Sequence, residues 1–525
     1  LLDTGARTLR SQFRDDPEAG EDLSRALARS YAGIGAFEQA RGLASNALDA
    51  ALQRFRPDSR EVIDARLDYA TILQLAGQQK QALQQAAWVL QHGGTADTAS
   101  LVRAHLVNAA ADNELLREPQ AEPEARQALQ AAQTLPPAQR DRFQAEAWKD
   151  LAQAALGRGH FDSAQHALRE SSALYERALG ANAVQTLDAR TNRIFLLLHT
   201  GHENEALDKY ARLVDGERAA FGPGSPKLAE TLGNYAYILW DTGHYAQSRS
   251  IAEQARQTLA AATGMSPLER ADSEMDMAIL ARLRGDLPGA ASTLDRIERV
   301  LVPLGANAQR LRFSVDWLRT ALAAERGDPD APARLDALQS QAQAMHYTLG
   351  FRQRMDWPLA WRALGQPQRA LQAYGELAAW PSDKRMRLEH HKQLLLAQGI
   401  TLVQLDRFDD AQKMLAAALS AFVGKPGDRM DAVTATLWRG WLAVRDGHAQ
   451  SGLADIEAAL AWRHAQLGDD SYLTAEARLA HAEALSRLGR SDEARREQAA
   501  ANDELAAILA PTHALRKRAE SPLPR

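Results

Sequence analysis

A short pattern of glycine, aromatic and small positions recurs along the 525 residues of the chain. It reads Gly, any residue, aromatic, two residues of any type, then Ala or Ser, as in the runs 35–40, 159–164 and 243–248. Asp406 takes the place of the glycine once, most intervals are 42 residues, and a degenerate copy near Arg117 fills the one long gap. The glycines of the series are Gly35, Gly77, Gly159, Gly201, Gly243, Gly285, Gly327, Gly365, Gly447 and Gly489. The period predicts about 12 copies of one helix–turn–helix unit.

Small residues flank these glycines at fixed distances. Two antiparallel helices cross closely only where side chains are small, and glycine can leave the first helix in a left-handed conformation. Ala, Leu, Gln, Arg and Glu dominate the composition, which favours helix throughout. We therefore expect an all-α chain. The small positions are Ala28, Ala70, Ala152, Ala236, Ala278, Gly399, Gly440 and Ala482 before the turn, and Ala40, Ala82, Ala164, Ala206, Ser248, Ala290, Ala370, Ala411 and Ala494 after it.

The pattern resembles the tetratricopeptide repeat, and its long period resembles the kinesin-light-chain type. The clearest match is the run 229–239 followed by Gly243-His244-Tyr245, and the resemblance covers about residues 20–510. It implies a right-handed superhelical solenoid. In such a solenoid the first helix of each repeat lines the concave surface and the second faces outward.

Asn or Asp stands nine residues before the turn glycine in six repeats. Such residues are unfavourable inside a helix because their side chains compete for backbone hydrogen bonds, so a special role is expected. The resemblance implies that they bind the main chain of an extended peptide along an acidic groove, since an amide or carboxylate can bond a peptide unit. The alternative is that each bonds the next repeat. The six are Asp68, Asn108, Asp150, Asn192, Asn234 and Asp276, and one turn earlier lie Asp64, Glu146, Asp188, Glu230 and Asp272.

Four further side chains are candidate contacts in this groove: Phe195, His199, Tyr237 and Trp240. An aromatic beside an amide could anchor an apolar group of a ligand. The competing interpretation is that they pack in the core, which is the role we assign to Trp438, Trp441 and Trp462.

Prolines interrupt the pattern between Gly327 and Gly365, where the spacing falls to 38 residues. Because Pro358 would break a helix interior, its helix is expected to be kinked or to start at Trp357. We divide the chain into a lead-in helix (1–20), a first solenoid (21–326), an irregular junction (327–381), a second solenoid (382–510) and a disordered basic tail (511–525). The junction could be a hinge or a drifted repeat that still stacks.

Charge and composition exclude several classes of protein. With 62 basic and 67 acidic residues the net charge is −5, which argues against a general nucleic-acid binder because such a protein needs a basic stripe. No run of 18 apolar residues exists, so no membrane insertion is expected within the chain. The absence of cysteine removes disulfides and thiolate sites.

Nucleotide-binding and hydrolase motifs are absent, and the adjacent pair His390-His391 would diverge on a helix. The run 221–226 resembles a phosphate loop only superficially, and Pro226 is expected to begin a helix. We expect no enzyme activity, no cofactor and no metal.

The first residues, Leu-Leu-Asp-x-Gly-Ala before an acidic Asp-Pro-Glu, resemble the segment that precedes repeats in large bacterial serine/threonine protein kinases. That likeness implies a regulatory region, periplasmic if a membrane helix precedes Leu1 and otherwise cytoplasmic. The chain is thus expected to bind a protein or peptide. The alternative is an assembly scaffold that dimerises through its convex faces or ends.

Overall fold

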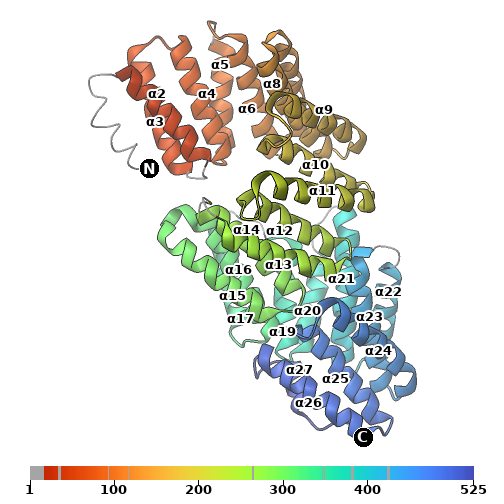
Figure 1. Ribbon diagram of the computed structural model, residues 1–525. Helices are drawn as coiled ribbons and strands as arrows, with labels where there is room; N and C mark the ends of the chain where they lie inside the picture. The colour runs from red at the N-terminus through yellow and green to blue at the C-terminus, as the bar shows by residue number, and fades with distance from the viewer. Residues whose placement is uncertain are drawn as a thin grey trace. The chain divides into compact units, whose positions relative to one another are not determined.

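The computed structural model describes residues 17–33, 37–92, 94–115, 117–262, 265, 267–345, 347, 349–379, 384–422 and 426–524. Within these ranges the regular structure is α-helix with three short 3-10 segments, and no strand occurs. The chain forms two compact units, Leu1–Gly222 and Pro223–Arg525, which we describe separately. The expected all-α fold is confirmed (Figure 1).

The first unit is a row of helix pairs, each packed on the next (Figure 1). First and second helices alternate through the row, as the sequence pattern predicts. The pairs are α2 (Pro17–Gly33) with α3 (Phe37–Arg54), α4 (Arg60–Leu75) with α5 (Gln79–His92), α6 (Thr98–Glu114) with α7 (Glu118–Ala131), α8 (Pro137–Gly157) with α9 (Phe161–Leu179), and α10 (Val184–His199) with α11 (Glu203–Phe221).

The second unit continues the same alternation and ends in one additional helix. Its pairs are α12 (Pro226–Asp241) with α13 (Tyr245–Ala261), α14 (Pro267–Leu283) with α15 (Leu287–Leu301), α16 (Gln309–Arg326) with α17 (Ala331–Ala344), α18 (Phe351–Arg354) and α19 (Asp356–Ala363) with α20 (Pro367–Ala378), α21 (Lys384–Gln404) with α22 (Phe408–Ala421), α23 (Arg429–Arg445) with α24 (Ala449–Leu467), and α25 (Tyr472–Arg487) with α26 (Ser491–Ile508), followed by α27 (Ala514–Glu520).

The turn inside each pair is left-handed, as expected. Every described glycine of the series has a positive φ, from 71° at Gly365 to 89° at Gly447. Asp406, which replaces the glycine, is the one non-glycine residue with positive φ in the described ranges, at 57°. Asp enters this region more easily than most residues because its short side chain can bond locally. The recurring glycine therefore marks a backbone requirement.

The small positions lie at the helix crossings. Ala70 and Ala82 of one pair, and Ala236 of another, are fully buried. A Cβ built on Gly440 would lie 2.7 Å from the carbonyl oxygen of Gly452, so α23 and α24 approach as closely as backbones can. Residue size at these points sets the distance between helices.

The proline-rich stretch differs from the other repeats in its first helix, which is split into α18 and α19. Pro358 lies in the first turn of α19, where its missing N–H costs little, and this agrees with the expected start near Trp357. The same stretch lies inside the second unit.

The prediction of a disordered tail is wrong for its middle part. Residues 514–520 form helix α27, whose Leu515 and Ala519 are buried in the core of the second unit. The sequence of this segment is basic, but its charges have partners: Arg518 pairs with Glu483 and Arg516 with Glu520. Burial of one apolar face is what holds the helix.

In the second unit the chain turns back, so that later repeats pack against the turns of earlier ones (Figure 1). We call this the edge contact. Most of its partners are 182–187 residues apart in sequence and advance by about one repeat on both sides. These hydrogen bonds join Tyr245 to Gly427 and Met430, Ser471 to Arg284, Tyr472 to Gly285, Ala510 to Arg326, and Thr512 to Gly327. Further bonds of the edge contact join Ala246 to Gln466, Arg249 to Leu467 and Tyr472 to Glu325.

Candidate peptide-binding face

The six Asn and Asp residues nine positions before the turns do not share one environment. The three earliest are buried, with exposed fractions of 6% for Asp68, 7% for Asn108 and 3% for Asp150. The three later ones are accessible: Asn192 is exposed, whereas Asn234 and Asp276 are half-buried. Only the accessible three can contact a ligand without rearrangement.

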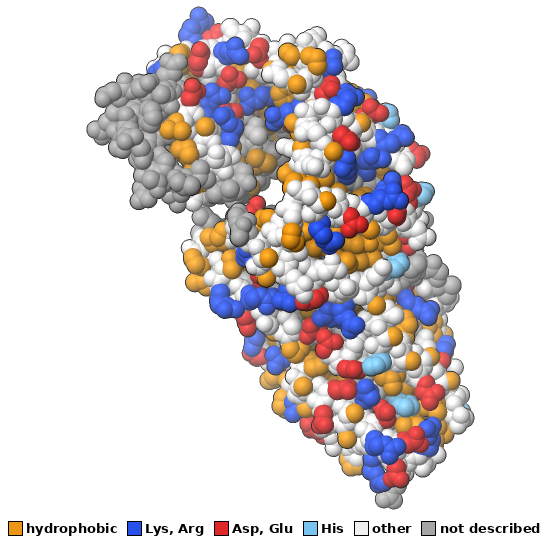
Figure 2. Space-filling model, viewed as in Figure 1, with side chains coloured by type: hydrophobic (Ala, Val, Ile, Leu, Met, Phe, Trp, Pro, Cys, Tyr) orange, Lys and Arg blue, Asp and Glu red, His pale blue; other side chains and the backbone are white. Residues whose placement is uncertain are grey.

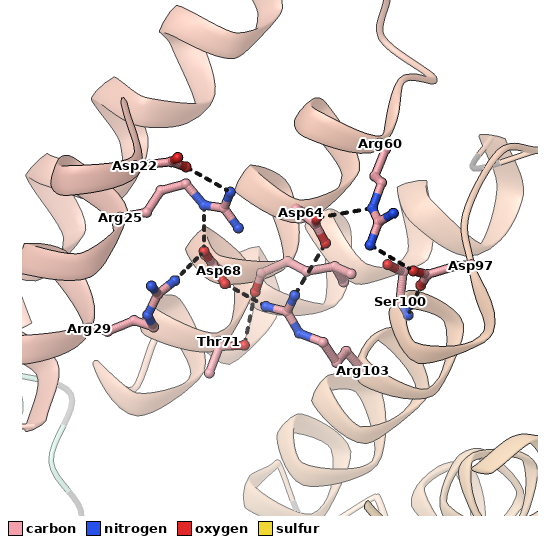
Figure 3. Close-up of polar contacts among 11 residues, drawn as sticks. Asp22, Arg25, Arg29, Arg60, Asp64, Asp68, Thr71, Asp97, Ser100 and Arg103 are labelled. Carbon is pink, nitrogen blue, oxygen red and sulfur yellow. Dashed lines mark hydrogen bonds and ion pairs between the residues drawn. The ribbon is translucent and has the colours of Figure 1, made fainter. Parts of the chain in front are cut away.

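Asp68 lies at the centre of an ion-pair network on the first helices of the first unit (Figure 3). Arg25 and Arg29 from α2 donate to its Oδ2 at 2.7 and 2.9 Å, and Arg103 from α6 donates to its Oδ1 at 2.5 Å. Asp64, one turn earlier on α4, forms an ion pair with Arg103 at 3.5 Å. Three neighbouring first helices are joined through one carboxylate, which is the arrangement expected of a tie between repeats.

The network leaves little free charge on this face. Four arginines and four carboxylates take part, since Arg60 bridges Asp64 and Asp97 and Asp22 lies 3.9 Å from Arg25 (Figure 3). Burial by itself would lower the pKa of Arg25, but the carboxylate of Asp68 outweighs it and leaves that pKa raised. The acidic groove expected here is therefore neutralised by arginine.

Asn108 and Asp150 are bonded inside the first unit. The Asn108 amide donates to Glu124 on α7 at 3.3 Å, and the backbone oxygen of Asp150 accepts from Asn113 on α6 at 3.0 Å. Burial, assisted by the charge of Glu146, raises the pKa of Asp150 to about 7. The Asn108 bond thus stays within one helix pair, whereas the bond at Asp150 joins the first helices α6 and α8 through the Asp150 backbone.

Asn192 opens onto the surface of α10, and Phe195 lies one turn later. Phe195 is half-buried and its ring meets the edge of Tyr210 on α11 at 6.5 Å between centroids. The side chain of His199 lies outside the described residues. Of the candidate ligand contacts on α10, Asn192 is thus exposed and Phe195 is partly accessible.

The second unit places an acidic and aromatic face on α12 and α14, formed by Glu230, Asn234, Tyr237, Asp272 and Asp276. We call these five residues the α12–α14 face. Tyr237 is 38% exposed. Burial, together with the charges of Asp272 and Glu230, raises the pKa of Asp276 to about 6. Burial also raises the pKa of Asp272.

The carboxylates of Asp272 and Asp276 have no ion pair with any described Lys or Arg, whereas Glu230 is bridged to Lys227 at 3.2 Å. Asp64 and Asp68 occupy the same two repeat positions in the first unit and are paired with arginine. Acidic and basic side chains are interspersed over the surface seen in Figure 2. Uncompensated negative charge on the α12–α14 face is therefore a local feature.

Trp240, a candidate ligand contact from the sequence, packs against other aromatic rings in the structure. Its ring packs edge-on against Tyr245 at 4.8 Å, and Tyr245 packs against Trp462 of α24 at 5.3 Å. These three rings link α12, α13 and α24 at the edge contact. Trp240 is half-buried there, and Trp462 packs as expected.

Sequence reasoning missed the arginines that neutralise the first unit's carboxylates. A signal was available in the sequence, since Arg25, Arg29 and Arg103 lie on the first helices next to α4. By contrast, α12 and α14 carry only three basic residues, at 227, 270 and 282. Comparing basic residues on adjacent first helices would have separated the compensated carboxylates from the free ones.

No protein-family model matches the chain, and no curated protein matches it. The helix pairs, their 42-residue period and their left-handed turns carry the assignment. The fold is tetratricopeptide-like.

Three solved structures illustrate the likeness. BtubC (BKLC) from P. vanneervenii is 15% identical with a TM-score of 0.35, and the match covers 46% of this chain and 92% of that one. A putative kinesin light chain of nearly identical TPR-like repeats from Podosopora anserina is 16% identical with a TM-score of 0.27, over 45% and 93%. Pseudomonas aeruginosa pilF is 18% identical with a TM-score of 0.30, over 48% and 96%.

The described residues contain no group of three or more His, Cys, Asp or Glu side chains arranged to hold a metal ion. Among the described helices none is both long and apolar enough to cross a membrane.

Proposed function

We propose that the chain is a non-catalytic protein-interaction solenoid that binds an extended, positively charged peptide segment on the α12–α14 face. The observation that carries the proposal is that the Asp nine residues before the turn has different surroundings in two repeats. Asp68 is bonded by three arginines, whereas Asp276 has raised pKa and no described cation beside it. A bound Lys or Arg would supply the missing charge and restore the carboxylates.

The neighbouring groups suit a peptide main chain. Asn234 can donate and accept at once, which matches the N–H and C=O of a peptide unit. Tyr237, one turn from it on α12, offers an exposed ring for an apolar or cationic side chain. Acid, amide and aromatic groups on adjacent helices fit a segment of alternating basic and apolar residues.

The test uses fluorescently labelled ten-residue peptides that are Lys/Arg-rich, neutral or Asp/Glu-rich, with binding followed by anisotropy. We expect the basic peptide to bind most tightly and Asp272→Asn with Asp276→Asn to weaken it about tenfold or more, since two charge-assisted contacts are lost. The matched control is Asp409→Asn with Asp503→Asn, which removes the same charge from exposed positions on α22 and α26.

Asn234→Ala supplies a second readout. It should weaken binding with an unchanged melting temperature, because Asn234 has no described partner to lose. Binding should also weaken as pH falls through about 6, where Asp276 takes up a proton. Equal binding of all three peptides, or equal loss in the control pair, would refute the proposal.

The regulatory setting is a further part of the proposal. It rests on the resemblance of the first residues, which lie outside the described ranges, to the segment that precedes repeats in bacterial serine/threonine protein kinases. The residues before Leu1 test it: a kinase domain there supports a signalling role, and an unrelated domain removes it.

A further inference from the structure

The edge contact of the second unit has two sides, and both kinds of surface recur uncovered in the first unit. In the second unit a turn packs on a connection between two helix pairs, where the N–H of Tyr472 donates to the carbonyl of Gly285 at 3.3 Å. A Cβ built on Gly285 would lie 2.6 Å from the hydroxyl of Ser471. A Cβ on Gly77 or Gly159, in turns of the first unit, would meet nothing within 4 Å. These two turns are therefore open.

One connection of the first unit has the same local backbone as a covered connection of the second. Gly180 closes α9 with φ of 92°, and Gly468 closes α24 with φ of 87°. The carbonyl of each glycine accepts from a threonine hydroxyl six residues later, at 2.8 Å from Thr186 and 2.9 Å from Thr474. The cap of the next helix differs, since it is Ala183 in the first unit and a serine in the second. The connection between α9 and α10 is thus shaped like one that receives a turn.

The apolar side chains of these two connections differ in exposure. Leu467 and Tyr472 of the covered connection are 0% and 8% exposed. Leu179 and Val184, at the same positions of the open connection, are 39% and 53% exposed. The N–H of Val184 also has no carbonyl to bond within its helix, because Val184 is the first residue of α10. The open connection therefore offers an apolar contact and a donor, as the covered one does.

Exposed apolar side chains are concentrated on two edges of the first unit. Leu75 and Leu156 lie beside the open turns and are 49% and 37% exposed; we call them the turn edge. Leu179, Val184 and Phe221 lie at the connections, with Phe221 39% exposed; we call them the connection edge. Five of the nine exposed large apolar side chains among the described residues are on these two edges, so their exposure follows the surfaces that the second unit pairs.

From this match we infer that the turn edge of one copy docks on the connection edge of a second copy. The occupant is a second copy because one unit carries both sides of the contact, and because the partner that covers such a connection in the second unit is a turn of the same kind. The two surfaces differ, so docking is head-to-tail and each pair keeps one open edge of each kind, to which further copies can add.

This assembly is independent of peptide binding. No residue of the turn edge or of the connection edge belongs to the α12–α14 face, so this proposal and the proposed function succeed or fail separately.

The test measures the mass of the full chain by sedimentation velocity over a range of concentrations. We expect monomers at about 1 µM and a growing series of larger species at about 100 µM, as for a small apolar interface of micromolar affinity. A wild-type chain that stays monomeric across this range would overturn the proposal.

Single charges on either edge should prevent assembly. Leu156→Arg charges the turn edge and Val184→Arg charges the connection edge, and each variant should stay monomeric over the whole range, because an arginine would be buried against apolar groups without a partner. Ala173→Arg, at an exposed position in the middle of α9, adds the same charge away from both edges and should assemble like the wild type. Melting followed by circular dichroism checks that each variant folds. Loss of assembly in Ala173→Arg as well would overturn the assignment to the edges.

Mixing the two edge variants tests the head-to-tail arrangement. Leu156→Arg keeps an intact connection edge and Val184→Arg keeps an intact turn edge, so an equimolar mixture should form dimers that cannot grow, although each variant alone is monomeric. A mixture that stays monomeric would overturn the head-to-tail contact. Assembly of Leu156→Arg alone, as in the wild type, would overturn it too, because another surface would then cover the connection edge.

Discussion

Asp150 shows how a single buried residue can make the stability of the chain depend on pH. It occupies the position taken by Asn in three other repeats, and no described Lys or Arg forms an ion pair with its carboxylate. Burial raises its pKa to about 7. In an unfolded chain the same group would titrate near pH 3.9. Between these values only the folded chain holds the proton.

The expected consequence is a loss of stability as pH rises from about 4 to about 7, which Asp150→Asn should abolish. At pH 8 the variant should be more stable by up to about 4 kcal/mol, an upper bound from a shift of about three pKa units. Urea denaturation at pH 5 and pH 8 measures this. Asp49→Asn, exposed on α3, is the control and should change neither value. An unchanged pH dependence in Asp150→Asn would contradict the buried, unpaired carboxylate.

At the scale of elements, the docking of α27 in the second unit depends on charge state. His513 caps it, with Nδ1 accepting from the N–H of Leu515 at 3.0 Å. Its pKa is lowered to about 3 by burial, and by the nearby Arg362 and Lys517. The capping nitrogen must be unprotonated to accept, so the cap and the neutral state depend on each other.

Acid should therefore release α27. The undocked chain takes up a proton near pH 6.5 and the docked one near pH 3, so stability of docking falls as pH drops through this window. Hydrogen exchange of residues 514–520, normalised to an unfolded peptide, should show lower protection at pH 5 than at pH 7. His513→Asn keeps a capping oxygen and should remove the difference. His448→Asn, exposed at the start of α24, should not. Retained acid loosening in His513→Asn would assign the effect to other groups.

The helices and their turns were predictable because backbone requirements repeat in the sequence. Gly285 and Asp406 both sit where the chain must be left-handed, and Ala70 sits where helices must touch. The neutralisation of Asp68 was not predictable from its own repeat, since its partners come from two neighbouring ones. The docking of α27 depends on residues far away in sequence, such as Gly327, so a basic composition alone suggested disorder.

At the scale of the molecule, the edge contact joins repeats of the second unit that are not adjacent in sequence. In a simple solenoid each repeat contacts only adjacent ones, and stability is a sum of local terms. Here the turn of α14 and α15 also meets the connection before α25, where Ser471 donates to the carbonyl of Arg284 at 2.6 Å. We expect early and late repeats of this unit to unfold together.

Two glycine substitutions separate this coupling from local strain. Gly285 and Gly447 have nearly the same turn, with φ of 80° and 89°, so an alanine costs about 1–2 kcal/mol at either through the left-handed backbone. A Cβ on Gly285 would lie 2.6 Å from the hydroxyl of Ser471, whereas one on Gly447 meets nothing within 4 Å. Gly285→Ala should therefore lower the melting temperature further than Gly447→Ala.

Gly285→Ala should also raise hydrogen exchange at residues 471–475, about 190 residues away in sequence, because it separates the two sides of the edge contact. Gly447→Ala should raise exchange only around its own turn. The comparison isolates the long-range part, since both variants carry the same backbone strain. Equal melting temperatures with unchanged exchange at 471–475 would mean that the repeats stack without the edge contact, and that the second unit is an ordinary open row.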